Sequence, residues 1–208
     1  MAVPLVFLSF LGLAFATLWG ITRFGNPTST GASVTIEFSA ACLDEATPML
    51  VERAKQVGMP VEMKNGVMHT TLPELPDAQN TIPQLLTTPG QLILKGENFE
   101  ASNDDIEEVA IELDRAGMPQ TLVKFNANTR AAIKELEDTV ELQPILDGVE
   151  MNAVKALEIK EEGILSIHAG EGKTADRMQR AADRAIVLAH GPLPCSVQSV
   201  VSAADPTH

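Results

Sequence analysis

The chain has 208 residues, 45% of them hydrophobic, which is enough for one large domain or two small ones with apolar cores. Its 28 acidic side chains outnumber its 15 basic ones and give a net charge of −13, so it lacks the clustered cations that nucleic-acid binding requires. With no Tyr and one Trp it also offers little for aromatic stacking, and we expect no nucleic-acid partner.

The N-terminal segment is apolar and carries no charged side chain before Arg23. A helix over residues 3–22 would span roughly 30 Å, the thickness of the hydrocarbon core of a bilayer. A cleaved signal peptide is the alternative, because Ala14 to Ala16 has a small-x-small pattern, but the basic start of a signal peptide is missing. We therefore expect a retained single transmembrane helix over 3–22, in contact with lipid, and a Gly, Ser, Thr and Pro-rich linker over 23–33.

Residues 34–95 predict the order strand, helix, strand, strand, helix, strand. Polar and apolar residues alternate over 34–38, and Thr47 with Pro48 predicts the N-cap and first-turn proline of a helix that ends near Gly58. The run Lys64-Asn65-Gly66 between two alternating stretches predicts a hairpin. The remaining elements are a shorter helix and a strand, over residues 77–86 and 91–95. This order is that of a ferredoxin-like unit, a sheet with both helices on one face.

The second half begins with an acidic stretch, residues 97–108, which lacks calcium-loop spacing and is interpreted as a solvated linker. Strands are expected over 108–113 and 121–125, followed by a helix that Asn126 caps and that extends to Glu137. A hairpin around Asp147-Gly148 and a strand over 164–168 come next. A helix that begins at Thr174 and is ended by Gly191 and Pro192 then leads to a last strand over 196–201. In the last helix an apolar stripe is predicted to face inward, made of Met178, Ala182, Ala185, Ile186 and Ala189.

The stretch Gly172-Lys173-Thr174 lies between a predicted strand and a predicted helix, where a phosphate-binding loop would lie. A Walker A loop would need a first glycine at position 167, which is Ile, and Glu171 would add a negative charge. We therefore interpret the stretch as a turn after which Thr174 caps the helix, with Lys173 in solvent. No nucleotide or other cofactor is expected.

The remaining reactive residues show no pattern of catalysis or metal binding. The four histidines are far apart, and no serine lies in a nucleophile elbow, so we expect neither an enzyme nor a metal site. Cys42 and Cys195 are the only cysteines and do not form a CxxC pair. Two alternatives stay open for them: a disulfide in an extracytoplasmic compartment, or two unrelated buried thiols.

Several stretches together resemble the SecD family of bacterial protein-export proteins, and specifically its large first periplasmic domain. They are VTIEF, VERAKQVG, LPELPDAQNTIPQLLTTPGQLIL, PQTLVKFNANTRAAIKELE, LQPILDGVEMNA and RAIVLAHGPLPCSVQSV, spread over residues 34–201. The chain departs from the family at PLPC, which replaces an alanine-rich stretch. A SecD protein also continues into a proton-conducting helix bundle, and since residues 3–22 contain no ionisable side chain, we expect no proton conduction by this chain alone.

The resemblance implies an α+β fold in which the single transmembrane helix is followed by two ferredoxin-like, split βαβ subdomains with antiparallel sheets. The expected parts are a base subdomain over 34–96, a head-like subdomain over 97–190, and a closing strand and tail over 191–208. Gly96 and Gly191, at the two ends of the head, are predicted hinge residues.

The implied function is that of a non-catalytic, periplasmic module, anchored in the bacterial inner membrane as a single-pass protein. It would bind unfolded exported polypeptides or other inner-membrane proteins, and a client could add a strand to a free sheet edge. The alternative is an accessory or assembly subunit of a larger inner-membrane complex. For that role Gly12, Ala16 and Gly20 form a face of small residues against which a partner helix could pack.

Overall fold

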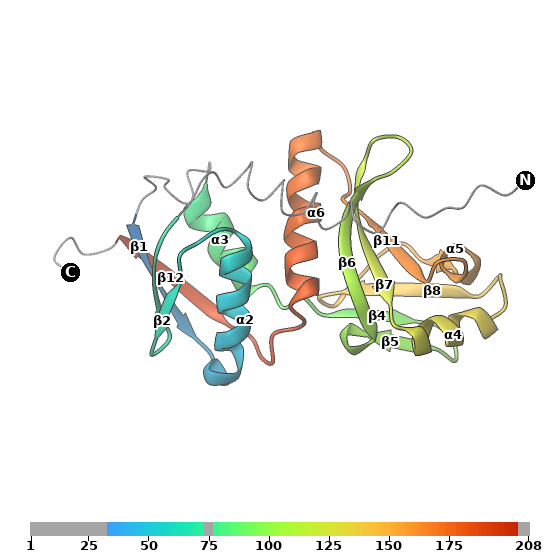
Figure 1. Ribbon diagram of the computed structural model, residues 1–208, viewed down its shortest axis with the longest axis horizontal. Coiled ribbons are helices and arrows are strands. Elements are labelled where there is room, and N and C mark those ends of the chain that lie inside the picture. The colour runs from blue at the N-terminus through green and yellow to red at the C-terminus, as the bar shows by residue number, and fades with distance from the viewer. Residues whose placement is uncertain (1–32, 73–76, 204–208) are drawn as a thin grey trace, which may run out of the picture.

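The computed structural model describes residues 33–72 and 77–203, which form two lobes with the long helix α6 (Thr174–Ala189) between them (Figure 1). We call the lobe that contains β1, β2, β3, β12, α2 and α3 the base lobe, and the lobe that contains β4 to β11, α4 and α5 the head lobe. The expected transmembrane helix and the face of Gly12, Ala16 and Gly20 lie outside the described residues, as does the predicted linker except for Ser33, which begins β1. Within 33–72 and 77–203, no helix has both the length and the apolar character that crossing a bilayer would require.

The base lobe is one antiparallel sheet with two helices. Its strands are β1 (Ser33–Ser39), β2 (Glu62–Lys64), β3 (Val67–Thr71) and β12 (Gln198–Ala203), in the order β12-β1-β3-β2. Val34, Ile36 and Phe38 are buried and alternate along β1 with residues that are more exposed, so one face of the sheet belongs to the core. The helices α2 (Leu43–Gln56) and α3 (Ala78–Thr87) contribute Leu50 and Leu86 to the same core.

The predicted order over residues 34–95 is wrong in its last strand. Residues 92–95 form β4, which pairs with β5 and β8 in the head lobe. The place beside β1 is taken by β12, through six antiparallel pairs from Val34–Ala203 to Ser39–Gln198. Two short apolar strands look alike in a sequence, and only the packing of the whole chain decides which one joins the base sheet.

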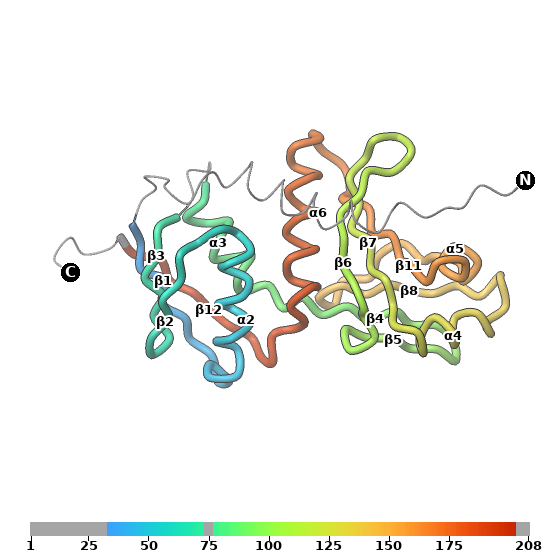
Figure 2. The backbone as a smooth tube through the Cα atoms, viewed as in Figure 1, coloured from blue at the N-terminus to red at the C-terminus, as the bar shows by residue number. Residues whose placement is uncertain are grey.

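The head lobe contains two further antiparallel sheets, traced in Figure 2. The first has the order β10-β8-β4-β5 with β9 paired to β8, and the second has the order β11-β7-β6. The strands are β4 (Leu92–Lys95), β5 (Glu100–Ser102), β6 (Ile106–Leu113), β7 (Pro119–Phe125), β8 (Glu141–Leu146), β9 (Val149–Glu150), β10 (Val154–Lys155) and β11 (Ile164–His168). The helices are α4 (Ala127–Glu135), α5 (Ala156–Lys160) and the short 3-10 helix η1 (Asn103–Asp105). Thus the α+β class with antiparallel sheets is confirmed.

The local turn and cap predictions agree with the structure. Asn65 and Gly66 have φ angles of 52° and 79°, and Asp147 and Gly148 have φ angles of 51° and 79°, as type I′ hairpin turns require. The side chain of Asn126 accepts a hydrogen bond from the Thr129 amide at 3.0 Å and caps α4.

Two boundary predictions are wrong. Helix α2 begins at Leu43, so Pro48 lies inside it rather than in its first turn, and the acidic Asp44 and Glu45 favour the earlier start through the helix dipole. The acidic stretch over 97–108 is not a solvated linker, because it contains β5, η1 and the start of β6. Ala101 within it is only 2% exposed.

The predicted inward stripe and cap of α6 are also corrected. The buried residues of this helix are Ala181, Ala182, Val187 and Leu188, and of the predicted stripe only Ala182 is among them. A helix between two lobes is covered on more than one face, which a single-stripe pattern does not describe. The N-cap position is Lys173 rather than Thr174, and no side-chain hydrogen bond caps the helix.

Candidate functional site

The candidate site is the junction where the chain passes between the lobes, at residues 86–91 on the way out and 190–195 on the way back. Arg53 of α2 lies between these segments and is fully buried. Its guanidinium donates hydrogen bonds to four backbone carbonyls. The acceptors and distances are Leu86 at 3.0 Å, Thr88 at 2.5 Å, Pro89 at 3.2 Å and Gly191 at 2.9 Å. One base-lobe side chain therefore holds both connections.

Arg53 remains a cation in this buried position. Burial lowers the pKa of Arg53 to about 10, while the charge of Asp147 acts in the opposite direction. The acceptors of its hydrogen bonds are backbone carbonyls rather than side-chain carboxylates. Several carbonyl dipoles can be bound at once by the planar guanidinium fork. The two connections also bind each other directly, through the Leu193 amide and the Pro89 carbonyl at 2.9 Å.

Gly90 is the glycine that the junction requires. Its φ is 75°, and a Cβ atom there would lie 2.9 Å from Arg53 Nη2 and 3.0 Å from the Val187 carbonyl. No larger residue fits this conformation and this close approach without a shift of its neighbours. Gly90 is not among the residues predicted from the sequence, although the run Thr88-Pro89-Gly90 between a helix and a strand is a turn signal.

The two predicted hinge glycines lie in different settings. Gly191 follows α6 with a φ of 75°, and its carbonyl accepts a hydrogen bond from Arg53. Gly96 lies in the turn between β4 and β5, inside a head-lobe sheet, where its amide donates to the Phe99 carbonyl at 2.7 Å. The hinge role of both residues stays a prediction.

A disulfide joins the base helix α2 to the returning segment. Cys42 and Cys195 are bonded, with their Cα atoms 6.1 Å apart, and they are 153 positions apart in the sequence. Cys42 immediately precedes α2, and Cys195 precedes β12. Together with the bond from Arg53 to Gly191, the disulfide attaches α2 to the returning segment at two points.

Arginines of α6 attach this helix to the head lobe. Arg180 donates through Nε to the Ala169 carbonyl at 2.7 Å, and Arg184 donates through Nη1 to the carbonyls of Ile167 and His168 at 3.2 and 3.1 Å. Burial lowers the pKa of Arg184, and the nearby charge of Arg180 adds to this effect. The sequence placed these side chains outside the predicted inward stripe and gave no sign of their carbonyl partners.

His190 lies at the C-terminal end of α6, beside the junction. Burial lowers the pKa of His190, the charge of Arg53 lowers it further, and Glu52 acts in the opposite direction. Its Nε2 atom is buried and has no hydrogen-bond partner among the described residues. The neutral imidazole is therefore the form that the folded junction favours.

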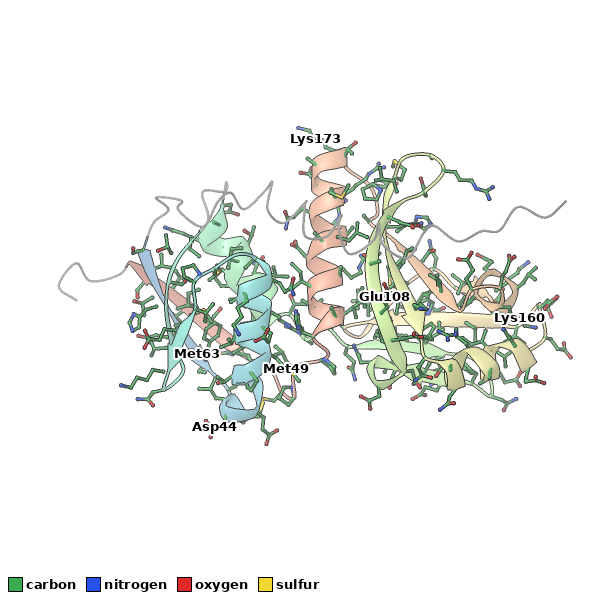
Figure 3. The ribbon with its side chains drawn as sticks, viewed as in Figure 1. Asp44, Met49, Met63, Glu108, Lys160 and Lys173 are labelled. Atoms are coloured by element: carbon green, nitrogen blue, oxygen red, sulfur yellow. A yellow bond between two sulfur atoms is a disulfide. The ribbon has the colours of Figure 1, made fainter. Side chains whose placement is uncertain are left out.

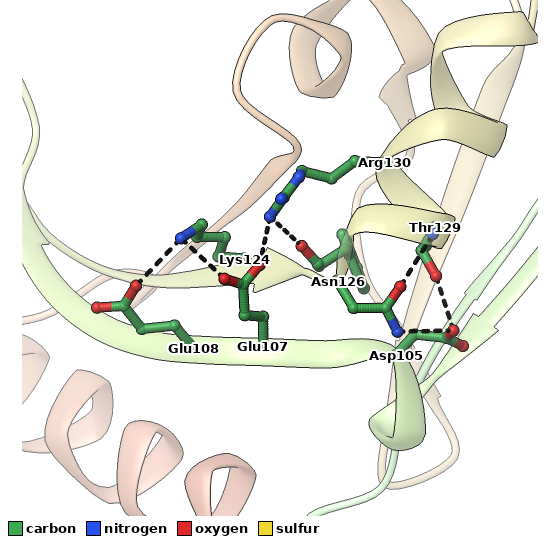
Figure 4. Close-up of polar contacts among 8 residues, drawn as sticks. Asp105, Glu107, Glu108, Lys124, Asn126, Thr129 and Arg130 are labelled. Carbon is green, nitrogen blue, oxygen red and sulfur yellow. Dashed lines mark hydrogen bonds and ion pairs between the residues drawn. The ribbon is translucent and has the colours of Figure 1, made fainter.

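A second polar cluster lies in the head lobe, where β6 and β7 meet α4 (Figure 4). Lys124 lies 3.4 Å from Glu107 and 3.5 Å from Glu108, and Arg130 pairs with Glu107. The carboxylate of Asp105 accepts hydrogen bonds from Thr129 Oγ1 at 2.7 Å and from the Ser102 amide at 2.9 Å. This cluster ties the start of β6 to β7 and α4.

The remaining residues of interest do not converge. Lys173 lies at the N-terminal end of α6 (Figure 3), beyond a turn in which Gly170 and Gly172 have φ angles of 77° and 125°. Across the described ranges there is no group of three or more His, Cys, Asp or Glu side chains that could hold a metal ion. The junction itself is built from backbone carbonyls and the buried cation of Arg53.

The comparisons with known proteins bear on the fold. No protein-family model matches the chain, and no curated protein matches its sequence. A crystal structure of SecDF in a super-membrane-facing form matches 90% of this chain with a TM-score of 0.65 and 15% identity. The fold is SecD-like. A second structure, described as the membrane component SecDF that enhances protein export, matches with a TM-score of 0.61 and 16% identity.

The extent of these matches differs between the two SecDF structures. The chain spans 33% of the first SecDF chain, about a third of its length. In the second comparison, 83% of this chain matches 100% of the SecDF chain in that structure. The SecD-like fold therefore extends over both lobes.

Proposed function

We propose that this chain is a non-catalytic polypeptide-binding or protein-binding module of protein export. The observation that carries the proposal is the SecD-like fold over both lobes, with all of one SecDF chain matched by 83% of this one. That SecDF is described as a membrane component that enhances protein export. The proposed location is the periplasmic side of a bacterial inner membrane, with residues 3–22 as a single-pass anchor.

Two features of the described residues support this location and role. The bond between Cys42 and Cys195 suits an oxidising compartment such as the periplasm. The Arg53 junction and the arginines of α6 hold the two lobes in a defined relation, so the sheet edges of the head lobe are presented on a stable support. Such edges offer main-chain hydrogen bonds to an extended chain without requiring a particular sequence.

The test uses the full chain in mild detergent and reduced, unfolded client proteins with a photocrosslinker. We expect crosslinks to several unrelated clients, at a higher yield than to a folded acidic protein of similar size. Crosslinking to unfolded clients at a yield no higher than to the folded acidic protein would overturn the proposal.

A stoichiometric inner-membrane partner in the same detergent would instead favour the accessory-subunit alternative. Its predicted contact face of Gly12, Ala16 and Gly20 gives the matching variant, Ala16→Leu, which should weaken such a complex by steric obstruction. The same variant should leave the capture of unfolded clients unchanged.

A further inference from the structure

The strand β6 is the longest edge strand in the described part of the chain. It has eight residues, whereas the other edge strands are β12 with six, β11 with five, β2 and β5 with three each, and β9 and β10 with two each. Among the described residues, the backbone of 107–113 has hydrogen bonds to β7 and to no other segment. A long edge of this kind presents a row of unpaired amide and carbonyl groups to another chain.

The two faces of β6 differ in chemistry. Residues paired across two antiparallel strands share a face, so Val109 and Ile111 lie on the face of Val123 and Thr121. That face is turned towards α6, because Thr121 Oγ1 donates to the Ala181 carbonyl at 3.2 Å. Leu113 lies on the same face and is 55% exposed. An added strand would find apolar neighbours on this face.

The opposite face of β6 is acidic. Glu108 and Glu112 pair with Lys124 and Gln120 of β7 and therefore lie on the face away from α6. Glu108 lies 3.5 Å from Lys124 of β7, and the neighbouring Glu107 pairs with both Lys124 and Arg130, so these two carboxylates have cationic partners. Glu112 has no ionic or hydrogen-bonded side-chain partner among the described residues. This face therefore keeps an uncompensated negative charge.

We propose that the β6 edge binds an extended polypeptide segment in which apolar side chains alternate with Lys or Arg. Side chains in an added strand point alternately to the two faces, so its apolar residues would lie beside Val109, Ile111 and Leu113. Its basic residues would lie beside Glu108 and Glu112 on the other face, where opposite charges on neighbouring strands attract. This inference rests on the proposed function and names the kind of client segment that the head lobe selects.

The test measures the binding of three labelled ten-residue peptides to the full chain in mild detergent by fluorescence anisotropy. One peptide alternates valine with lysine, one alternates valine with glutamate, and one has the composition of the first with its lysines grouped at one end. We expect the alternating valine-lysine peptide to bind most tightly. It should also slow amide hydrogen exchange over 107–113 more than over β12.

Charge-reversal variants test the contribution of the acidic face of β6 to peptide binding. Glu112→Lys should weaken binding of the valine-lysine peptide roughly fivefold or more, because an attraction across neighbouring strands becomes a repulsion. The matched control is Glu150→Lys, an exposed glutamate of β9 in a different sheet, which should leave binding unchanged.

The outcomes separate this inference from the proposed function. Unfolded clients that bind with no preference for the valine-lysine peptide, or that protect another edge instead of 107–113, overturn the inference and leave the proposed function standing. No binding of any peptide or unfolded client overturns both, and the glutamates of β6 would then serve only to keep this edge from pairing with other chains.

Discussion

The two lobes hold distant segments together with polar side chains in different ways. At the junction, the buried cation of Arg53 in the base lobe binds neutral carbonyls of both connections. In the head lobe, the exposed carboxylate of Glu107 pairs with Lys124 and Arg130, while the partly buried Asp105 accepts hydrogen bonds from Thr129. The comparison indicates that burial, more than the number of contacts, decides how much each polar group contributes to stability.

The largest effect is expected at Arg53. Arg53→Met keeps much of the side-chain volume but removes four buried or partly buried hydrogen bonds to carbonyls, so the free energy of unfolding should fall by about 3–5 kcal/mol. Urea unfolding followed by circular dichroism measures it.

The matched control for Arg53 is Lys55→Met, on the same helix. Lys55 is exposed and pairs with Glu52 at 2.6 Å, and the loss of such a surface pair should leave the free energy of unfolding nearly unchanged. Equal losses in the two variants would show that the carbonyl contacts of Arg53 have no special weight.

The disulfide should have the next largest effect. The double variant Cys42→Ser and Cys195→Ser releases the second attachment of α2 to the returning segment, and we expect a loss of about 2–4 kcal/mol. Thermal unfolding gives the loss, and a reducing agent should produce a similar shift in the unaltered chain. If the double variant and the parent unfold at the same temperature, the disulfide contributes nothing to the stability of the junction.

In the head lobe, the strongest effect is expected at Asp105. Burial would raise the pKa of Asp105, but hydrogen bonds from Thr129, Ser102 and Asn126 outweigh it and hold the pKa below its ordinary value of 3.8. The folded state therefore favours the carboxylate, and this stability is present above pH 3.8 and lost as the pH falls through the folded pKa.

Asp105→Ala should cost about 1–2 kcal/mol at neutral pH and remove this acid-dependent part. Urea unfolding at pH 7 and pH 3 measures both. A variant that loses as much stability on acidification as the parent would assign the acid dependence to other carboxylates.

Protonation of His190 should lower the stability of the fold by a smaller amount than protonation of Asp105, and at a higher pH. Burial and the charge of Arg53 lower its pKa, so the unfolded chain binds a proton more readily than the folded chain. The stability from neutral His190 is fully present above pH 6.5 and declines as the pH falls from 6.5 towards the folded pKa.

Urea midpoints measured between pH 7.5 and pH 5 should therefore fall less in His190→Gln than in the parent. The charged groups around this imidazole are Arg53 and Glu52 on α2, and Glu52 is paired with Lys55. Identical slopes in parent and variant would remove His190 as the source of the pH dependence.

The smallest effect is expected at Glu107, whose ion pairs with Lys124 and Arg130 are shown in Figure 4. The hydrogen bond from Arg130 is the main cause of the lowered pKa of Glu107, but the side chain is 44% exposed. Glu107→Gln should therefore leave the free energy of unfolding nearly unchanged, because solvent screens an exposed ion pair. A loss as large as that of Asp105→Ala would contradict the contrast between buried and exposed polar groups.

Part of the candidate site could be read from the sequence. A disulfide between Cys42 and Cys195 is one of the two alternatives that the sequence leaves open, and Gly191 is predicted from the sequence to end α6. Arg53 gave no sequence signal, because one arginine on a helix usually lies in solvent and its carbonyl partners are 33 to 138 positions away. The open edge of β6 is likewise invisible until the neighbours of each strand are known.

The sequence by itself determined the local features of this protein: the Asn65-Gly66 and Asp147-Gly148 turns, the Asn126 cap and the position of most strands. These depend on backbone preferences and hydrogen bonds between residues only a few positions apart. Only the tertiary structure decided that β12 rather than β4 completes the base sheet, that α6 is covered on more than one face, and that Arg53 binds both connections. Those outcomes depend on contacts between residues far apart in the chain, whose partners are selected when the whole core packs.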